Sequence, residues 1–264
     1  MNYPIWNGNI PFFDPAAETP DNFTFYPAAA EAPKPCVVVL PGGGYLARAP
    51  HEGAPIGAFF QANGLHAAVV DYRVAPNRFP AGLADAKRVI RTLRARADEW
   101  KIDPEQIFVC GFSAGGHLAA STALWQDVYE KTDEIDEYSD LPNGLILCYT
   151  LVSFCEEWGH PKSGKRLLGE ERCAAEGEQF CLSDRVTEAT PPTFLWHTAD
   201  DATVPVRNAL EFAKALAAHS VPFALHVFPH GKHGLALAEG AEDVHEWTRL
   251  VLQWIRSTAK RKDG

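Results

Sequence analysis

One serine of this sequence lies in a pattern that can make a hydroxyl nucleophilic. Ser113 is the centre of Gly111-Phe112-Ser113-Ala114-Gly115, which follows a short apolar run and precedes a stretch rich in alanine and leucine. A G-x-S-x-G pattern between a strand and a helix exposes its serine on a sharp turn above a sheet. The two glycines leave room for the turn, because a Cβ atom there would meet the neighbouring strand or helix. The pattern is short enough to arise by chance, so its meaning depends on partners elsewhere.

Candidate partners for Ser113 follow it in the chain. A serine hydroxyl needs a base to take its proton and a carboxylate to orient that base. In doubly wound folds these groups come from loops after later strands, the acid before the base. Two adjacent acids, Asp200 and Asp201, follow one predicted strand, and two histidines, His230 and His233, follow the next. This order predicts that one member of each pair joins Ser113, and spacing alone leaves open which one.

A glycine-rich stretch early in the chain is a candidate oxyanion hole. Pro41-Gly42-Gly43-Gly44-Tyr45 comes directly after an apolar run. A flexible turn explains its composition equally well, but its position is that of the loop that lends an amide to the oxyanion hole. We expect the amides of Gly43 or Gly44 to act together with that of Ala114. Each such donor is typically worth about 3 kcal/mol of transition-state stabilisation.

Apolar patterning predicts the strands and helices that would position these residues. The predicted strands are Phe23–Tyr26 at an edge, Cys36–Leu40, His66–Tyr72, Ile107–Cys110, Leu145–Leu151, Thr193–Thr198 and Phe223–Phe228. The predicted helices are Ala54–Ala62, Ala81–Trp100, the stretch from Ser113 to about Leu124, Asn208–His219 and Asp243–Arg256. Strands that alternate with helices predict an α/β fold with a mostly parallel sheet covered on both faces. We expect one domain over residues 1–264.

Three segments depart from this alternation. Residues 1–34 are rich in proline, asparagine and aromatic residues, which is typical of an extended N-terminal arm. Residues 152–192 are long and irregular with short helical pieces, and we expect them to form a cap-like insertion over the sheet, because long loops often carry function. The acidic run Asp133–Asp140 is expected to be a solvated surface segment.

Composition restricts the partners of this protein. Its formal net charge is −10, which argues against nucleic acid and anionic membranes. The N-terminus has no basic region followed by an apolar one, and no apolar run approaches the roughly 18 residues of a membrane-spanning helix. We therefore expect a cytoplasmic protein that acts on small molecules, as a monomer or a homodimer.

The six cysteines show no C-x-x-C pairing. Three lie in predicted strands and are expected to be buried, reduced thiols: Cys36, Cys110 and Cys148. Three others fall within the irregular insertion, where free thiols are favoured over a disulfide or a metal site: Cys155, Cys173 and Cys181.

Several motifs together resemble a known family. The segments are PGGGY, DYRVAP (Asp71–Pro76), FPAGLADAKRVIRTLR (Phe79–Arg94), VCGFSAGGHLAA, TPPTFLWHTADDATVPV (Thr190–Val206) and FPHGKHGLALA. They resemble bacterial α/β-hydrolase carboxylesterases, most closely the acetyl-xylan and feruloyl esterase-like group, which is related to the hormone-sensitive-lipase esterases. The resemblance extends from about residue 35 to the C-terminus. It implies the α/β-hydrolase fold and a reaction that needs no metal or cofactor.

The resemblance also assigns roles. Ser113 corresponds to the nucleophile, Asp201 to the acid of a D-x-x-V-P motif, and His233 to the base of a G-x-H-G motif. Asp200 and His230 then become neighbours without a catalytic role. Pro41 departs from the broader lipase-like pattern, in which many relatives have a histidine before the glycines.

The implied reaction is hydrolysis of a carboxylic ester through an acyl-enzyme. The family suggests deacetylation of small carbohydrate esters such as acetylated xylo-oligosaccharides, with a generalist carboxylesterase or a feruloyl esterase as the alternative. Candidate substrate-binding residues are Tyr45, Trp158 and His160. An amidase or peptidase of the same fold would use the same three groups, and a non-catalytic binding module is the most distant alternative, because none of the three is missing.

Overall fold

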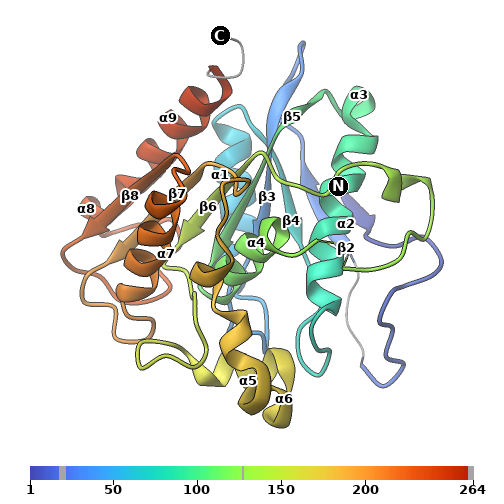
Figure 1. Cartoon of the computed structure of the whole chain (residues 1–264). Helices are drawn as coiled ribbons and strands as arrows, with labels where there is room; N and C mark the ends of the chain where they lie inside the picture. Colours follow the sequence, from blue (N-terminus) through green and yellow to red (C-terminus); the bar gives the residue numbers. More distant parts are fainter. Residues whose placement is uncertain (18–21, 127, 261–264) are drawn as a thin grey trace.

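A computed structural model describes residues 1–17, 22–126 and 128–260 of the chain (Figure 1). Within these residues an eight-stranded sheet runs in the order β1-β2-β4-β3-β5-β6-β7-β8. The strands are β1 (Asn2–Pro4), β2 (Asn22–Tyr26), β3 (Lys34–Leu40), β4 (His66–Val70), β5 (Ile102–Phe112), β6 (Gly144–Cys148), β7 (Thr193–Thr198) and β8 (Phe223–Phe228). All neighbours from β4 to β8 are parallel, and β1 and β2 pair in antiparallel fashion at one end.

Helices cover both faces of this sheet because its central strands are apolar on both sides. Val38 and Leu40 of β3 point into one core cluster with α2 (Ala81–Ala95), α4 (Ala114–Leu124) and α7 (Arg207–Ala218). Val37 and Val39 point into the other cluster with α1 (Ala54–Ala62) and α9 (Trp247–Lys260). The predicted α/β-hydrolase architecture, with a mostly parallel sheet between two helical layers, is confirmed.

The N-terminal arm is more ordered than expected. Its segment NFTFY forms β2, which pairs antiparallel with β4, and β1 extends the sheet by pairing with β2. Phe23 and Phe25 are buried and alternate with partly exposed residues, which is the period of a strand with one face on the core. The prediction of an edge strand at Phe23–Tyr26 was therefore nearly right, but β1 lies outside it.

Several predicted elements have different limits in the structure. The predicted helix Asp243–Arg256 is divided at Glu246 into two helices, and the predicted strand His66–Tyr72 ends at Val70. The strand before Ser113 begins at Ile102 rather than Ile107. The predicted helix Ala81–Trp100 is interrupted at Arg96, which separates α2 from α3 (Ala97–Trp100). The predicted strand Leu145–Leu151 ends at Cys148, because Tyr149 has a positive φ of 36° and turns the chain away from the sheet.

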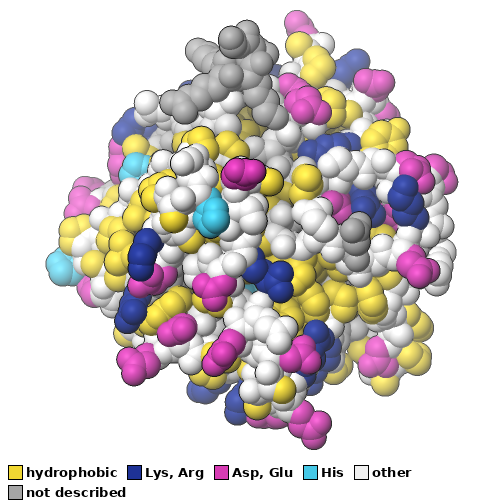
Figure 2. All heavy atoms as spheres, viewed as in Figure 1, with side chains coloured by type: hydrophobic (Ala, Val, Ile, Leu, Met, Phe, Trp, Pro, Cys, Tyr) yellow, Lys and Arg dark blue, Asp and Glu magenta, His cyan; other side chains and the backbone are white. Residues whose placement is uncertain are grey.

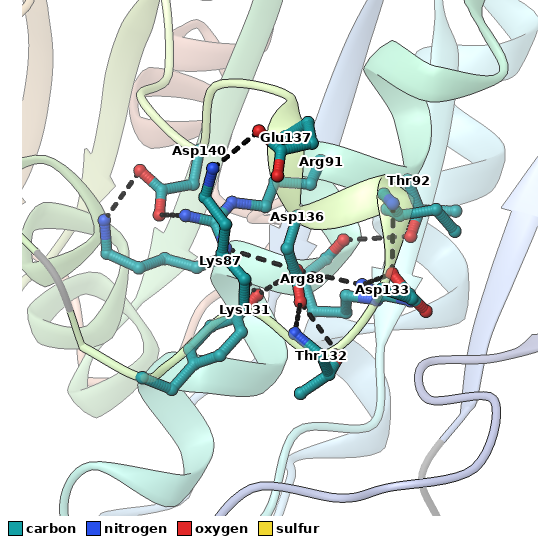
Figure 3. Close-up of polar contacts among 12 residues, drawn as sticks. Lys87, Arg88, Arg91, Thr92, Lys131, Thr132, Asp133, Asp136, Glu137 and Asp140 are labelled. Carbon is teal, nitrogen blue, oxygen red and sulfur yellow. Dashed lines mark hydrogen bonds and ion pairs between the residues drawn. The ribbon is translucent and has the colours of Figure 1, made fainter.

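The prediction that the acidic run is a solvated surface segment is only partly right, because Glu134 and Glu137 are exposed while Asp136 and Asp140 are buried. The run contains the short helix η2 (Glu134–Glu137), and the side chain of Asp136 is fully buried. Asp136 Oδ1 lies 2.9 Å from Arg88 Nη1 and 3.2 Å from Arg91 Nη1, both on α2 (Figure 3). Asp140 pairs with Arg91 and Lys87, and Asp133 pairs with Arg88. The run is acidic because it neutralises basic side chains of α2 that would otherwise be buried without a partner.

The insertion after β6 contains most of the remaining helices. They are α5 (Pro161–Leu168), α6 (Glu170–Glu176), η3 (Gly177–Phe180) and η4 (Leu182–Arg185). Helices α5 and α6 lie together at the lower end of the molecule in Figure 1, and η1 (Pro50–Glu52) and α8 (Glu242–His245) complete the fold. All six cysteines are free thiols, and Cys155 is the exposed one.

The surface carries mixed charge. Lysine and arginine side chains are interspersed with aspartate and glutamate over the face drawn in Figure 2, and no large area of one sign is visible there. No helix in the described part of the chain has both the length and the apolar character needed to cross a bilayer.

Candidate active site

Ser113 lies on a tight corner between β5 and α4. Its backbone has φ 52° and ψ −119°, a combination that non-glycine residues adopt rarely and that is typical of functional sites. A Cβ atom on Gly111 would lie 2.1 Å from the carbonyl oxygen of Gly115. A Cβ atom on Gly115 would lie 2.1 Å from the carbonyl oxygen of Leu40. Both obstacles are backbone atoms, so the two glycines of the motif are needed for the corner to close.

His233 and Asp201 extend from Ser113 in a line of hydrogen bonds. Ser113 Oγ lies 2.8 Å from His233 Nε2 and can donate to it. His233 Nδ1 lies 2.7 Å from Asp201 Oδ2, which fixes the ring hydrogen on Nδ1. Asp201 follows β7 and His233 follows β8, at the carboxyl ends of adjacent parallel strands. The structure thus brings together the three residues that the sequence motifs select.

Asp201 is held in its charged form. Burial of the carboxyl group raises its pKa, but hydrogen bonds with His197, His233 and the amide of Val204 outweigh burial and keep the pKa well below its usual value. Its second oxygen, Oδ1, accepts from the amides of Thr203 at 2.8 Å and Val204 at 2.9 Å. A carboxylate that stays ionised at neutral pH can stabilise an imidazolium on His233.

The two alternative partners do not reach the serine. His230 Nδ1 lies 2.9 Å from Asp200 Oδ2, and Asp200 Oδ1 accepts from the amide of Gly231. The His230 side chain is 87% exposed. Asp200 and His230 therefore form a surface pair that joins the loops after β7 and β8. The choice of Asp201 and His233 over these neighbours, which spacing left open, follows from their burial beside Ser113.

The glycine loop after β3 faces the serine. Gly43 has a φ of 126°, and a Cβ atom there would lie 2.2 Å from the carbonyl oxygen of Ala47. The amide of Gly42 is already used, because it donates to Glu52 Oε2 at 2.7 Å. Gly43 and Gly44 both line the cavity at Ser113, and Ala114 is the first residue of α4. Gly43 and Gly44 are thus beside Ser113, while Ala114 is not among the described lining residues, and the oxyanion hole formed by their amides stays a prediction.

Glu52 is a buried residue of the site that sequence reasoning missed. Its Oε1 accepts from the Tyr149 hydroxyl at 2.6 Å, while its Oε2 accepts from Gly42. The same hydroxyl accepts from the amide of Ala236 at 3.0 Å, and the Tyr149 ring meets the His233 ring edge-on at 5.0 Å. Glu52 and Tyr149 thus connect the glycine loop to the loop that carries His233. No local sequence pattern around Glu52 predicts this role.

The cavity at Ser113 has a volume of about 280 Å³. Its walls include Gly43, Gly44, Leu151, His160, Ser163, Arg166, Thr203 and His233. His160, from the insertion, is the one predicted substrate-binding residue among them. Arg166 and Ser163 of α5 also line the cavity and were not predicted, because a helical position in an irregular segment gives no signal of which side chains point inward.

Tyr45 and Trp158 are absent from the described lining of the cavity, contrary to expectation. Tyr45 is 2% exposed, and its hydroxyl donates to His117 Nδ1 at 2.8 Å. The Nε2 of His117 donates to the carbonyl oxygen of Phe180 at 3.2 Å, so the Tyr45 hydroxyl is part of a hydrogen-bonded chain within the core. Burial lowers the pKa of His117 to about 4 and keeps it neutral. Trp158 is likewise part of the main core cluster, because the insertion folds it inward.

Comparisons with known proteins identify the family. The family model described as BD-FAE matches residues 24–216. Endo-1,4-beta-xylanase B of Butyrivibrio fibrisolvens is 34% identical over 241 residues, which cover 89% of this chain and 38% of that protein. An acetylxylan esterase of Xylanibacter ruminicola is 27% identical over 232 residues, which cover 86% of this chain and 46% of that protein. The chain thus spans less than half the length of these two relatives.

A solved structure agrees over nearly the whole chain. The acetyl ester-xyloside bifunctional hydrolase from Caldicellulosiruptor lactoaceticus superposes with a TM-score of 0.92 at 42% sequence identity, covering 98% of this chain and 96% of that one. The family match, the identity and the shared fold lead to one conclusion. This chain belongs to the BD-FAE family and has the α/β-hydrolase fold.

Proposed function

We propose that this protein is a serine esterase that deacetylates small carbohydrate esters such as acetylated xylo-oligosaccharides. The observation that carries the proposal is the line of two hydrogen bonds, 2.8 Å from Ser113 to His233 and 2.7 Å from His233 to Asp201. It supplies a nucleophile, a base and an orienting acid within the distances that general-base catalysis needs.

In the first step Ser113 Oγ attacks the ester carbonyl carbon, and its proton passes to His233 Nε2. The carbonyl oxygen becomes an oxyanion that accepts hydrogen bonds from the amides of Gly43, Gly44 and Ala114. The carbon–oxygen bond to the alcohol then breaks, and His233 returns the proton to the leaving alcohol. The acyl group remains on Ser113.

In the second step a water molecule attacks the acyl carbon while His233 takes one of its protons. The bond between the acyl carbon and Ser113 Oγ breaks, and His233 gives its proton back to Oγ. The products are the carboxylic acid and the free serine. Asp201 stays ionised throughout and stabilises the imidazolium that forms twice.

Two observations support an acetylated sugar as substrate. The relatives include proteins named acetylxylan esterase and acetyl ester-xyloside hydrolase. The cavity of about 280 Å³ at Ser113 is small, which favours a short acyl group. A generalist carboxylesterase or feruloyl esterase is the alternative of the same class, and it differs in accepting large acyl groups.

Hydrolysis assays test the proposal. We would compare p-nitrophenyl acetate, butyrate and octanoate with acetylated xylo-oligosaccharides, using the wild type, Ser113→Ala and the control Ser257→Ala on the exposed part of α9. We expect preference for acetyl esters, acetate release from the sugars, and a loss of kcat of about 10⁵- to 10⁶-fold in Ser113→Ala alone. Full turnover by Ser113→Ala would refute the mechanism, and activity confined to aryl esters would refute the sugar substrate.

A further inference from the structure

One wall of the cavity is formed by α5, which directs Arg166 toward Ser113. Arg166 is half-buried and lines the cavity, and its Nη1 lies 3.3 Å from the carbonyl oxygen of Gly44. No carboxylate in the described part of the chain forms an ion pair with it. Arg88 and Arg91, by contrast, each pair with two aspartates. A guanidinium offers five N–H donors, so most of those on Arg166 have no acceptor among the residues that the structure describes.

The one acid in the described lining does not pair with Arg166. Among the described residues that line the cavity, Glu52 is the one carboxylate. Both of its oxygens already accept hydrogen bonds, from the Gly42 amide and the Tyr149 hydroxyl. Arg166 therefore lines the cavity without a carboxylate partner among the described residues. A guanidinium placed in this way can pair with an anionic group of a ligand.

His160 adds a further donor to the same wall. Its Nδ1 accepts from the amide of Ser163 at 3.3 Å and lies 2.8 Å from Ser163 Oγ. With Nδ1 accepting, the ring hydrogen is on Nε2. Burial, followed by the positive charges of Arg166 and His233, lowers the pKa of His160, so the ring is neutral. The α5 wall thus offers one cation and a neutral N–H group, and it needs a ligand rich in acceptors.

We propose that Arg166 forms a subsite for a carboxylate carried by the substrate, close to the ester that Ser113 attacks. The inference rests on the proposed esterase function and narrows its substrate class to acidic esters, such as an acetylated sugar that bears a uronic acid. A planar guanidinium matches a carboxylate through two parallel hydrogen bonds, and partial burial strengthens them. Sugar hydroxyls would gain less, because they carry no charge.

Matched pairs of esters test this subsite. On the leaving-group side, 3-acetoxybenzoate is compared with its methyl ester. On the acyl side, mono-4-nitrophenyl glutarate is compared with its methyl ester. The readout is the ratio of kcat/KM for the charged ester to that for the neutral ester. We compare wild type, Arg166→Met, Arg166→Lys and the control Lys162→Met, which removes the same charge from the exposed side of α5.

We expect the ratio in one of the two pairs to fall by about 10- to 100-fold in Arg166→Met, the effect of losing a charge-assisted hydrogen bond. Arg166→Lys should restore part of it, since the charge remains but the planar fork is lost. Lys162→Met should leave the ratio unchanged. The pair that responds identifies the side of the ester on which the carboxylate binds.

Two results would overturn the subsite. One is an unchanged ratio in Arg166→Met for both pairs, which would leave Arg166 as a support for the glycine loop through Gly44. The other is an equal fall in Lys162→Met, which would make the effect long-range. If no neutral ester is turned over by the wild type, the esterase proposal has failed. Calorimetric binding of 3-acetoxybenzoate to Ser113→Ala, with and without Arg166→Met, then still decides whether the carboxylate is bound.

Discussion

Two clusters of buried acids in this molecule have similar electrostatics but different partners. At the α2 surface, Asp136 lies between Arg88 and Arg91 (Figure 3). At the carboxyl ends of β7 and β8, Asp201 faces His233. In each case burial raises the pKa of the carboxyl group, and hydrogen bonds outweigh burial and lower the pKa below its usual value. A buried, ionised aspartate is therefore no sign of chemistry by itself.

The partners make the difference. A guanidinium does not release a proton in proteins, so Arg88 and Arg91 can only fix Asp136 and its loop in place. An imidazole gains and loses a proton near neutral pH, and the second nitrogen of His233 lies 2.8 Å from Ser113. The α2 cluster also contains Tyr129, whose hydroxyl donates to Asp136 Oδ1 at 2.8 Å, but burial and this hydrogen bond raise the pKa of Tyr129 far above neutral, so it keeps its proton. Acid–base chemistry at neutral pH requires a partner such as the imidazole of His233, which connects Asp201 to Ser113.

Replacing the acid in the active site should have the largest effect. Asp201→Asn removes the charge that stabilises the imidazolium and reverses the preferred tautomer of His233, so we expect kcat to fall by about 10⁴-fold. Asp200→Asn is the matched control and should change kcat little, because its pair with His230 is exposed. Steady-state kinetics on p-nitrophenyl acetate measures both, and equal losses in the two variants would contradict the assignment.

The corresponding change at the α2 cluster should affect stability instead. Asp136→Asn leaves Arg91 and Arg88 with one acid fewer in a buried setting, so we expect the free energy of unfolding to fall by about 3 kcal/mol. Turnover per folded molecule should be unchanged. Glu137→Gln, in an exposed pair with Lys131, serves as control and should cost at most about 1 kcal/mol. Urea denaturation measures these values, and a stable Asp136→Asn variant with impaired turnover would reverse the comparison.

Glu52 is a third buried acid, and it combines features of the two clusters. It is a buried residue at the candidate active site, its hydrogen-bond partners are a neutral amide and a hydroxyl, and His51 Nε2 lies 3.8 Å from its Oε1. Glu52→Gln presents an NH₂ group to one of two donors, so the glycine loop or Tyr149 must shift. We expect kcat to fall by about 30-fold, the effect of one charge-assisted hydrogen bond. An unchanged kcat with reduced stability would place Glu52 with the α2 cluster.

The smallest expected effect is on the pH dependence of stability. The pKa of Asp136 is lower in the folded protein than the value of about 3.9 expected when unfolded. Its contribution to stability is therefore complete above about pH 5 and is lost as the pH falls toward the folded pKa. The stability difference between wild type and Asp136→Asn should narrow by about 1 kcal/mol between pH 7 and pH 3. A constant difference over this range would contradict the charge-based explanation.

The sequence predicted the residues near Ser113 better than the α2 cluster. Ser113, Asp201 and His233 could be selected because each lies at a fixed place in a local motif after a strand. The pairing of Asp136 with Arg88 joins residues 48 positions apart, and no local pattern reports it. An acidic run has the same composition whether it is solvated or covers a basic helix.

The lining of the cavity was predicted least well. Tyr45 and Trp158 were predicted to line the cavity, but their rings are buried in the hydrophobic core. Large apolar side chains gain more free energy from burial than from exposure in a cavity. Arg166 and Glu52 reach the cavity from a helix of the insertion and from the turn after the glycine loop. Their orientation depends on how these segments pack, which single-sequence patterns do not contain.

The most direct test of the central claim is to trap the covalent intermediate. Wild-type enzyme is mixed with p-nitrophenyl acetate, quenched in acid within the first turnover, and digested for mass spectrometry. We predict an acetyl group on the peptide that contains Ser113, absent in Ser113→Ala and strongly reduced in Asp201→Asn at the same quench time. Acetylation of a different residue, or undiminished labelling in Asp201→Asn, would contradict the account that His233 and Asp201 make Ser113 the nucleophile.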